Sequence, residues 1–360
     1  MTPHGGQDPD GGHSARAAGE VTAVEAALAA LAAGRAVVVA DDRQGQLVMA
    51  ADAVDTDAVA FFLQHTAGLI GVALPAQRLD ELGIPLMVEH PVGDAVALSV
   101  SVDLIGASVS AAGRAETIRA LADPERDGNA FSRPGAVFPI RARPAGVLER
   151  PGYTEAAVDL ARMAGRAPAG ALCAITSEDK RGLARGAELE RLGLPVVSIS
   201  EVVAHRLTHE RLLTRAARAF LPTRAGEFEC FGWQHLVDGS QHVALLCGDI
   251  SGDEPVLVAV HTECLAGDVL GSQLCDCRER LDQALEQIAA AGRGVCVYVR
   301  QPEGRGLRLD HVHSQMPAGA GWLDPDVTAE RWEEGIAAQI LADLGVRHVR
   351  LLSTHEGEPR

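Results

Sequence analysis

The stretch HTECLAGDVLGSQLCDC, residues 261–277, brings three of the chain's seven cysteines close together. Cys264 follows an apolar, strand-like run, and Cys275 and Cys277 precede a helix-like run. Zinc prefers thiolate ligands, and a hydrolytic zinc site uses three protein ligands and keeps a fourth position for water. The spacing therefore predicts an open zinc site, with three ordinary buried thiols as the alternative. His261 is a poor fourth ligand, because its strand position places it on the opposite face from Cys264.

The composition is that of a globular protein rather than a disordered one. Apolar residues make up 47% of the 360 residues, and 49 acidic against 32 basic side chains give a net charge of −17. This charge argues against a general surface for nucleic acid or anionic membrane, although it does not exclude a local basic pocket for a phosphate. Neither a membrane span nor a signal pattern is visible. We therefore expect a cytoplasmic protein with reduced cysteines.

The chain length and the order of apolar runs predict two α/β (α+β) domains. Residues 1–20, rich in Gly, Pro and His, are expected to form a disordered tail. Thr22 and Glu25 form a capping box that opens a helix ending near Gly34. The run AVVVADD, residues 36–42, then reads as a buried strand, and strands alternate with helices as far as about residue 205.

A second domain is expected after a basic linker at residues 209–224. It opens with two strand-like runs, HVALLCGDI (242–250) and PVLVAVHTE (255–263). A helix follows from residue 277, with Leu281, Leu285 and Ile288 on one face and Gly292 as its end. A further strand, helix and strand complete this domain, which we place at residues 225–360.

Three segments of the second half resemble GTP cyclohydrolase II. They are residues 242–260, 260–277 and 290–309, the last reading AAGRGVCVYVRQPEGRGLRL. The resemblance implies that the cysteines bind Zn²⁺ and that an activated water opens the imidazole ring of GTP at C8 with loss of formate. It also implies a homodimer and a nucleotide site that includes Glu263, Glu303, Gly304, Arg305 and Ser353.

The catalytic arginine of this family falls on an altered stretch. The family has a D-x-R sequence before its penultimate helix, and its arginine attacks the α-phosphate to release pyrophosphate. Here Glu330 stands at the aspartate and Trp332 at the arginine, with Arg331 one residue out of register. One residue on a helix is a rotation of about 100°. Glu330 and Arg331 are therefore the candidate catalytic pair only if the helix start is rebuilt, and a solvated helix start is the alternative.

Other positions of the second half also depart from the family. An arginine of the family is Ala259, a glutamine is Arg280, and Pro302 is inserted before EGR. The end of the chain, LLSTHEGEPR, lacks the lysine of the family, and we expect this domain to be C-terminally truncated.

The first half resembles 3,4-dihydroxy-2-butanone 4-phosphate synthase over residues 21–208. The similar segments include LGIPLMVEH (82–90), FSRPGAVFPIRA (131–142) and AGALCAITSED (169–179). The two halves stand in the order of the bifunctional riboflavin-biosynthesis family. However, the acidic loop of the synthase is shortened to DDRQGQ, residues 41–46, and hard divalent cations need several oxygen ligands.

Several reactive positions of the synthase are also replaced. Tyr153 stands at a metal-binding histidine, and Ala174, Gly113 and Ala136 stand where the synthase has acids or bases. We therefore expect that this half has lost the synthase reaction. The remaining family residues either still hold a sugar phosphate or support the fold; they are Arg133, Arg150, Thr154 and Glu155.

Three functions remain open at this point. The chain is a zinc hydrolase that acts on a purine nucleotide or related heterocycle, a non-catalytic homologue or regulatory subunit, or the complete bifunctional enzyme. The cysteine triad favours the first unless zinc serves only the fold.

Overall fold

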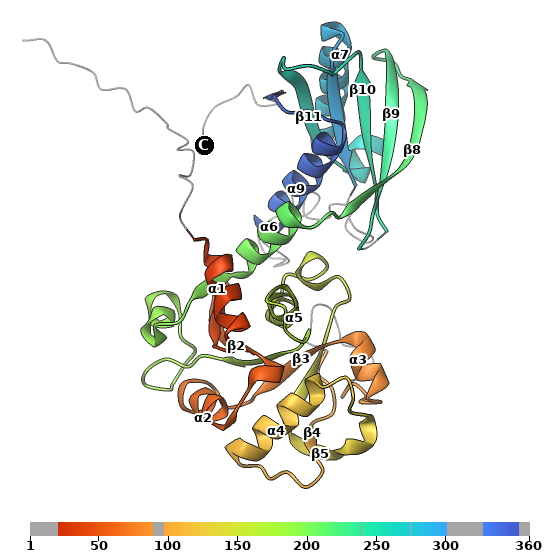
Figure 1. Cartoon of the computed structure of the whole chain (residues 1–360). Coiled ribbons are helices and arrows are strands. Elements are labelled where there is room, and N and C mark those ends of the chain that lie inside the picture. Colours follow the sequence, from red (N-terminus) through yellow and green to blue (C-terminus); the bar gives the residue numbers. More distant parts are fainter. Residues whose placement is uncertain (1–20, 89–96, 238, 274, 301–326, 353–360) are drawn as a thin grey trace, which may run out of the picture.

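Two mixed β-sheets, each covered by helices, make up the two halves of the chain in the computed structural model (Figure 1). The structure describes residues 21–88, 97–237, 239–273, 275–300 and 327–352, and it describes residues 327–333 by their backbone alone. The expected tail at residues 1–20 lies outside this range. The predicted α/β class and the two-domain organisation are confirmed.

The N-terminal sheet has seven strands in the order β4-β5-β3-β6-β2-β1-β7. Helices α1, α5 and α6 pack on one face and α2, α3 and α4 on the other. Its helices and strands are α1 Ala23–Ala32, β1 Val37–Ala40, β2 Gly45–Ala50, α2 Thr56–His65, β3 Gly71–Pro75, α3 Ala76–Glu81, β4 Val102–Leu104, α4 Ala111–Ala122, β5 Phe131–Ala142, α5 Tyr153–Met163, β6 Gly170–Ala174, β7 Val196–Ser198 and α6 Ile199–His209.

The C-terminal sheet has six strands in the order β13-β11-β12-β10-β9-β8, with α7 on one face and α9 on the other. Alternation along β11 explains the two faces, since Leu257 and Ala259 pack with α7 while Val256 and Val258 pack with α9. Its helices and strands are β8 Leu213–Pro222, β9 Glu227–His235, β10 Gln241–Cys247, β11 Val256–Thr262, α7 Cys277–Ala291, β12 Gly294–Val299, α9 Val327–Asp343 and β13 Val349–Leu351.

Two predicted helix boundaries are confirmed by their caps. The Thr22 side chain accepts from the backbone N–H of Glu25, and the Glu25 carboxylate accepts from the backbone N–H of Thr22, which starts α1. Helix α7 ends at Gly292, whose φ of 65° is a left-handed conformation that glycine adopts without strain. None of the described helices has the length and hydropathy that crossing a bilayer requires.

The segment expected to be a linker contains a strand. Residues 213–222 form β8, which pairs antiparallel with β9 and lies at the edge of the C-terminal sheet. Nearly all of its side chains are exposed, so it lacks the apolar alternation by which a strand is recognised in a sequence. This part of the segment therefore belongs to the second sheet.

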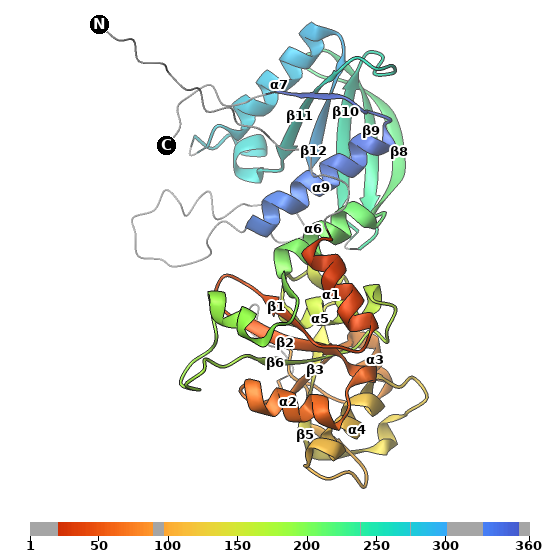
Figure 2. The same cartoon turned by 60° about the vertical axis from the view of Figure 1, so that its left-hand side comes forward.

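The two halves meet where α6 lies against α9 (Figure 2). Gly335 of α9 faces Leu207 of α6 so closely that a Cβ atom on the glycine would lie 2.8 Å from the Leu207 Cβ. Buried apolar side chains continue across this contact, including Val203 of α6 and Ile336 and Ile340 of α9. One hydrophobic core therefore runs through both halves.

Gln339 completes this contact with hydrogen bonds. Its Nε2 donates to the carbonyls of Leu207 (2.6 Å) and Glu210 (3.0 Å), and its Oε1 accepts from the N–H of Leu212 (3.0 Å). The last carbonyls of a helix have no partner within the helix. A side chain of the second half thus caps the final helix of the first.

Replacing Gly335 by valine tests the close approach of α6 and α9. We expect Gly335→Val to lower the free energy of unfolding by about 1–3 kcal/mol, the usual cost of overpacking. The better helix propensity of valine offsets only about 0.5 kcal/mol of this. The measurement is urea unfolding followed by circular dichroism. Ala338→Val, on the exposed face of the same helix, is the control, and equal losses in the two variants would contradict the close contact.

Candidate metal centre

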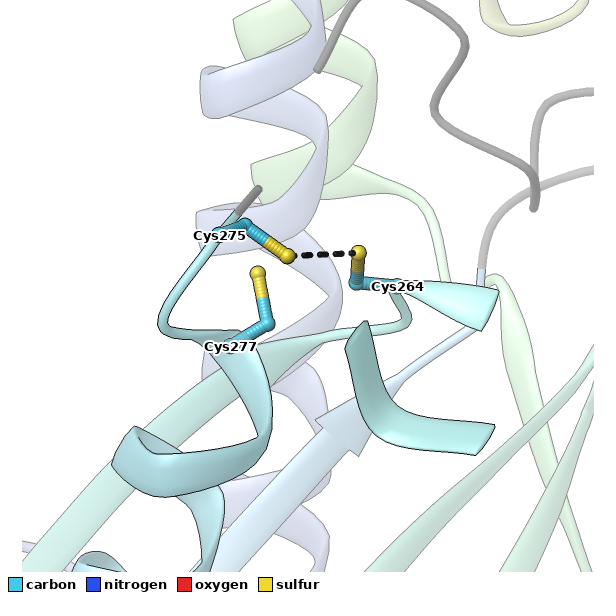
Figure 3. A group of neighbouring side chains, drawn as sticks. All are labelled: Cys264, Cys275 and Cys277. Atoms are coloured by element: carbon cyan, nitrogen blue, oxygen red, sulfur yellow. Dashed lines mark hydrogen bonds between the residues drawn. The ribbon is translucent and has the colours of Figure 1, made fainter. Parts of the chain in front are cut away.

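The three cysteines of the opening stretch come together at one end of the C-terminal sheet (Figure 3). Their sulfur atoms all lie within 4.8 Å of one another, and the Sγ atoms of Cys264 and Cys275 are 3.8 Å apart. Cys264 and Cys277 are buried, whereas Cys275 is half-buried. The structure confirms that the three predicted ligands are neighbours in space.

The turn after Cys264 is shaped for this cluster. Residues Leu265–Val269 form a π-helical turn, and the backbone N–H of Gly267 points at the Cys264 sulfur at 3.4 Å. A Cβ atom on Gly267 would lie 2.8 Å from the Cys275 sulfur and 2.9 Å from the Cys277 Cβ. Glycine at this position therefore leaves the space that the Cys264 and Cys275 sulfurs and the Cys277 Cβ occupy.

The sulfur positions suit a tetrahedral soft metal. A zinc ion with Zn–S distances of about 2.3 Å holds its thiolates about 3.8 Å apart, which matches the Cys264–Cys275 separation. Burial and the neighbouring thiols raise the pKa of Cys277, and burial also raises the pKa of Cys264. A metal ion would displace these protons. Within the described residues, no histidine or carboxylate joins the group of three.

A network around Asp268 lies beside the cluster and was not predicted from the sequence. The Asp268 carboxylate accepts hydrogen bonds from the Tyr298 hydroxyl (2.7 Å), the Cys264 N–H (2.9 Å) and His261 Nε2 (3.0 Å). His261 thus lies in this network, bonded to Asp268. Asp268 contacts Cys264 only because the turn between them bends the chain back. The spacing of residues in the sequence therefore does not predict this contact.

Polar side chains also gather where β11 and β12 end. The two strands are parallel, and Glu263 and Arg300 follow them directly. Arg300 Nε donates to the Glu263 carboxylate at 3.3 Å, next to Cys264. Ligands of α/β sheets bind outside the carboxyl ends of parallel strands. Arg300 is thus a further charged group at this edge that the sequence analysis did not single out.

The remaining predicted site residues cannot be placed around the cluster. Glu303, Gly304, Arg305 and Ser353 lie outside the described residues. Glu330 and Arg331 lie in the first part of α9, where the backbone alone is described.

In the N-terminal half, the replaced synthase positions are built into local contacts. The Tyr153 hydroxyl donates to the carbonyl of Gln44 at 2.9 Å, and burial together with the Asp41 carboxylate raises its pKa. The same Asp41 carboxylate accepts from the N–H groups of Arg43 and Gln44. A Cβ atom on Gly113 would lie 2.0 Å from the carbonyl oxygen of Ser108, so no side chain fits there.

The retained synthase residues make contacts that support the fold. Glu155 is fully buried and accepts from Arg150 Nε (2.9 Å) and the Arg143 N–H (3.0 Å). Arg133 donates to the carbonyl of Leu82 at 3.0 Å, and Thr154 is buried. These contacts favour the interpretation that the four residues serve the fold.

Comparison with known proteins assigns a family to each half. A model of 3,4-dihydroxy-2-butanone 4-phosphate synthase matches residues 25–205, and a model of GTP cyclohydrolase II matches residues 214–358. The "Riboflavin biosynthesis protein RibBA" of Mycobacterium tuberculosis (strain ATCC 25618 / H37Rv) is 44% identical over 356 residues, which cover 92% of this chain and 84% of the relative. The protein of the same name from Nocardia farcinica is 44% identical over 352 residues, with 92% and 85% covered.

A solved structure shares the two-domain arrangement. It is the crystal structure of "RibBX, a two domain 3,4-dihydroxy-2-butanone 4-phosphate synthase from A. baumannii", which is 30% identical in sequence. The TM-score is 0.74, and the match covers 92% of this chain and 94% of the other. The similarity therefore includes both halves and the way in which they are joined.

Proposed function

Since the chain belongs to the riboflavin-biosynthesis family that joins a 3,4-dihydroxy-2-butanone 4-phosphate synthase to a GTP cyclohydrolase II, we propose a function for each half. The C-terminal half is a zinc-dependent hydrolase that opens the imidazole ring of GTP or a related purine nucleotide and releases formate. The observation that carries this proposal is the group of three cysteine sulfurs within 4.8 Å of one another. A homodimer is the expected assembly.

Each group in the proposed site has a distinct task. Cys264, Cys275 and Cys277 would hold the zinc ion, which when bound acts as a Lewis acid and makes water nucleophilic near neutral pH. Glu263, at the carboxyl end of β11, would bind the nucleotide, with Arg300 fixing the orientation of its carboxylate. Further contacts with the nucleotide are proposed for Glu303, Gly304, Arg305 and Ser353. Glu330 and Arg331 are proposed to act in the release of pyrophosphate.

The zinc site can be tested by metal analysis of the purified protein. We expect about one zinc per chain in protein isolated from metal-replete cells, because three thiolates converge on one point. Cys275→Ser removes one of the three ligands and should lose most of this zinc. Cys247→Ser, at another half-buried cysteine outside the group, should keep it. Wild-type protein without zinc, or equal zinc in both variants, would refute the site.

A non-catalytic zinc-binding homologue is the second candidate. Ala259, which stands where the cyclohydrolase family has an arginine, is buried against α7, so no charge reaches the site from this position. Zinc at three cysteines also contributes folding free energy without any reaction. The complete bifunctional riboflavin enzyme is the third candidate, favoured by the 44% identity to relatives named "Riboflavin biosynthesis protein RibBA".

Formate release separates these candidates. Zinc-loaded protein should release formate from GTP or from another purine nucleotide in a panel, measured with formate dehydrogenase. Cys275→Ser should abolish the release, because the hydrolysis depends on zinc. If no nucleotide in the panel yields formate above the level of the variant, the protein is the non-catalytic homologue.

For the N-terminal half, we propose that the synthase reaction has been lost. The reaction needs a divalent metal, and Tyr153 now occupies a metal-ligand position and donates to the backbone of the shortened acidic loop. At Gly113 the turn at Ser108 leaves no room for an acidic side chain. Together these contacts support the proposal that the domain is kept for its structure.

This loss can be measured directly. Incubation of the protein with ribulose 5-phosphate and Mg²⁺ should give no 3,4-dihydroxy-2-butanone 4-phosphate, as followed by mass spectrometry. A 3,4-dihydroxy-2-butanone 4-phosphate synthase assayed in parallel is the positive control. Turnover comparable to the control would show that the replaced positions are not required.

A further inference from the structure

The Asp268 carboxylate, beside the cysteines, accepts hydrogen bonds from three groups of the protein. It is buried, with 7% of its surface exposed. Its Oδ2 accepts from the Tyr298 hydroxyl and from the Cys264 N–H, and His261 Nε2 lies 3.0 and 3.1 Å from its two oxygens. Because a carboxylate only accepts, the His261 nitrogen is the donor. Both oxygens are therefore occupied by the protein itself.

These partners come from separate elements. His261 lies on β11 and Tyr298 on β12, where the two residues pair in register and their rings stack with centroids 5.4 Å apart. The backbone carbonyl of Asp268 accepts from Arg278 in α7 at 2.7 Å, and its N–H donates to the Cys264 carbonyl at 2.7 Å. One residue thus links the sheet, the turn after Cys264 and the helix that begins at Cys277.

We propose that Asp268, oriented by His261 and Tyr298, is a positioning residue that holds the thiol of Cys264 where the metal requires it. This inference rests on the proposed zinc site. Asp268 itself is not a ligand, because its oxygens are occupied and it is absent from the metal-binding group of the described residues. It acts through the backbone of Cys264 and through Gly267, one residue before it, which lies beside the sulfurs of Cys264 and Cys275 and the Cβ of Cys277.

The test compares zinc affinity in two conservative variants. Asp268→Asn keeps the size of the side chain and removes acceptor capacity, and Tyr298→Phe removes one hydroxyl while the ring remains. Groups that orient metal ligands typically contribute 10–100-fold to affinity. By competition with a chromophoric chelator, we expect Asp268→Asn to bind zinc about 10–100-fold more weakly, and Tyr298→Phe about 10-fold more weakly.

The matched control is Tyr153→Phe, which removes the hydroxyl of a half-buried tyrosine in the other half. It should bind zinc as the wild type does. A second readout is the d–d absorption of the cobalt-substituted protein at full saturation. This absorption reports the ligand geometry, which a general loss of stability does not change, and it should differ from wild type in Asp268→Asn.

Each outcome supports or overturns the inference. Weak binding with an altered cobalt spectrum supports it, provided that Tyr153→Phe is unaffected. Wild-type affinity and spectrum in Asp268→Asn would overturn it while leaving the zinc site intact. Equal weakening in Tyr153→Phe and Tyr298→Phe would also overturn it. A wild-type protein that binds no zinc would overturn the proposed function, and this inference with it.

Discussion

The packing of α9 between the C-terminal sheet and α6 is the constraint on which both halves depend. Ile336 and Ile340 of α9 are buried in the core that includes one face of the sheet. Gly335 of the same helix packs closely against Leu207 of α6. Without α9, one face of β11 and β12 would be exposed to water. This exposure would cost a free energy of about 25 cal/mol per Å² of apolar surface. Helix α9 therefore both covers the sheet whose strand ends carry the cysteines and joins that sheet to the first half.

The cysteine cluster and the region around Tyr153 differ in how the surrounding residues pack. In the C-terminal half, Gly267 and the turn around it leave space for the three cysteine side chains. In the N-terminal half, Tyr153 and Asp41 bond to the neighbouring backbone, and Glu155 is saturated by arginine and backbone donors. One region brings three thiols together, and in the other the polar side chains bond to the surrounding protein. This contrast is the physical basis for the proposal of catalysis in one half and a scaffold role in the other.

Local signals in the sequence predicted those features that depend on neighbouring residues. The capping box of Thr22, the end of α7 at Gly292 and the meeting of three cysteines all follow from short-range chemistry. Strand β8 was missed because an exposed edge strand has no apolar alternation. The Asp268 network was missed because it depends on the register of β11 and β12, which brings His261 beside Tyr298. Contacts set by tertiary geometry have no signature in spacing alone.

The turn at Ser108 has a consequence for how this chain can change further. Because the carbonyl oxygen of Ser108 occupies the space beside Gly113, an acidic residue at that position is tolerated only after the turn has moved. Substitutions at the two places are therefore strongly non-additive, since each is unfavourable without the other. A single replacement at Gly113 therefore does not introduce an acidic side chain without a compensating change in the turn at Ser108. Packing at this turn, as well as side-chain chemistry, then decides which substitutions are tolerated at Gly113.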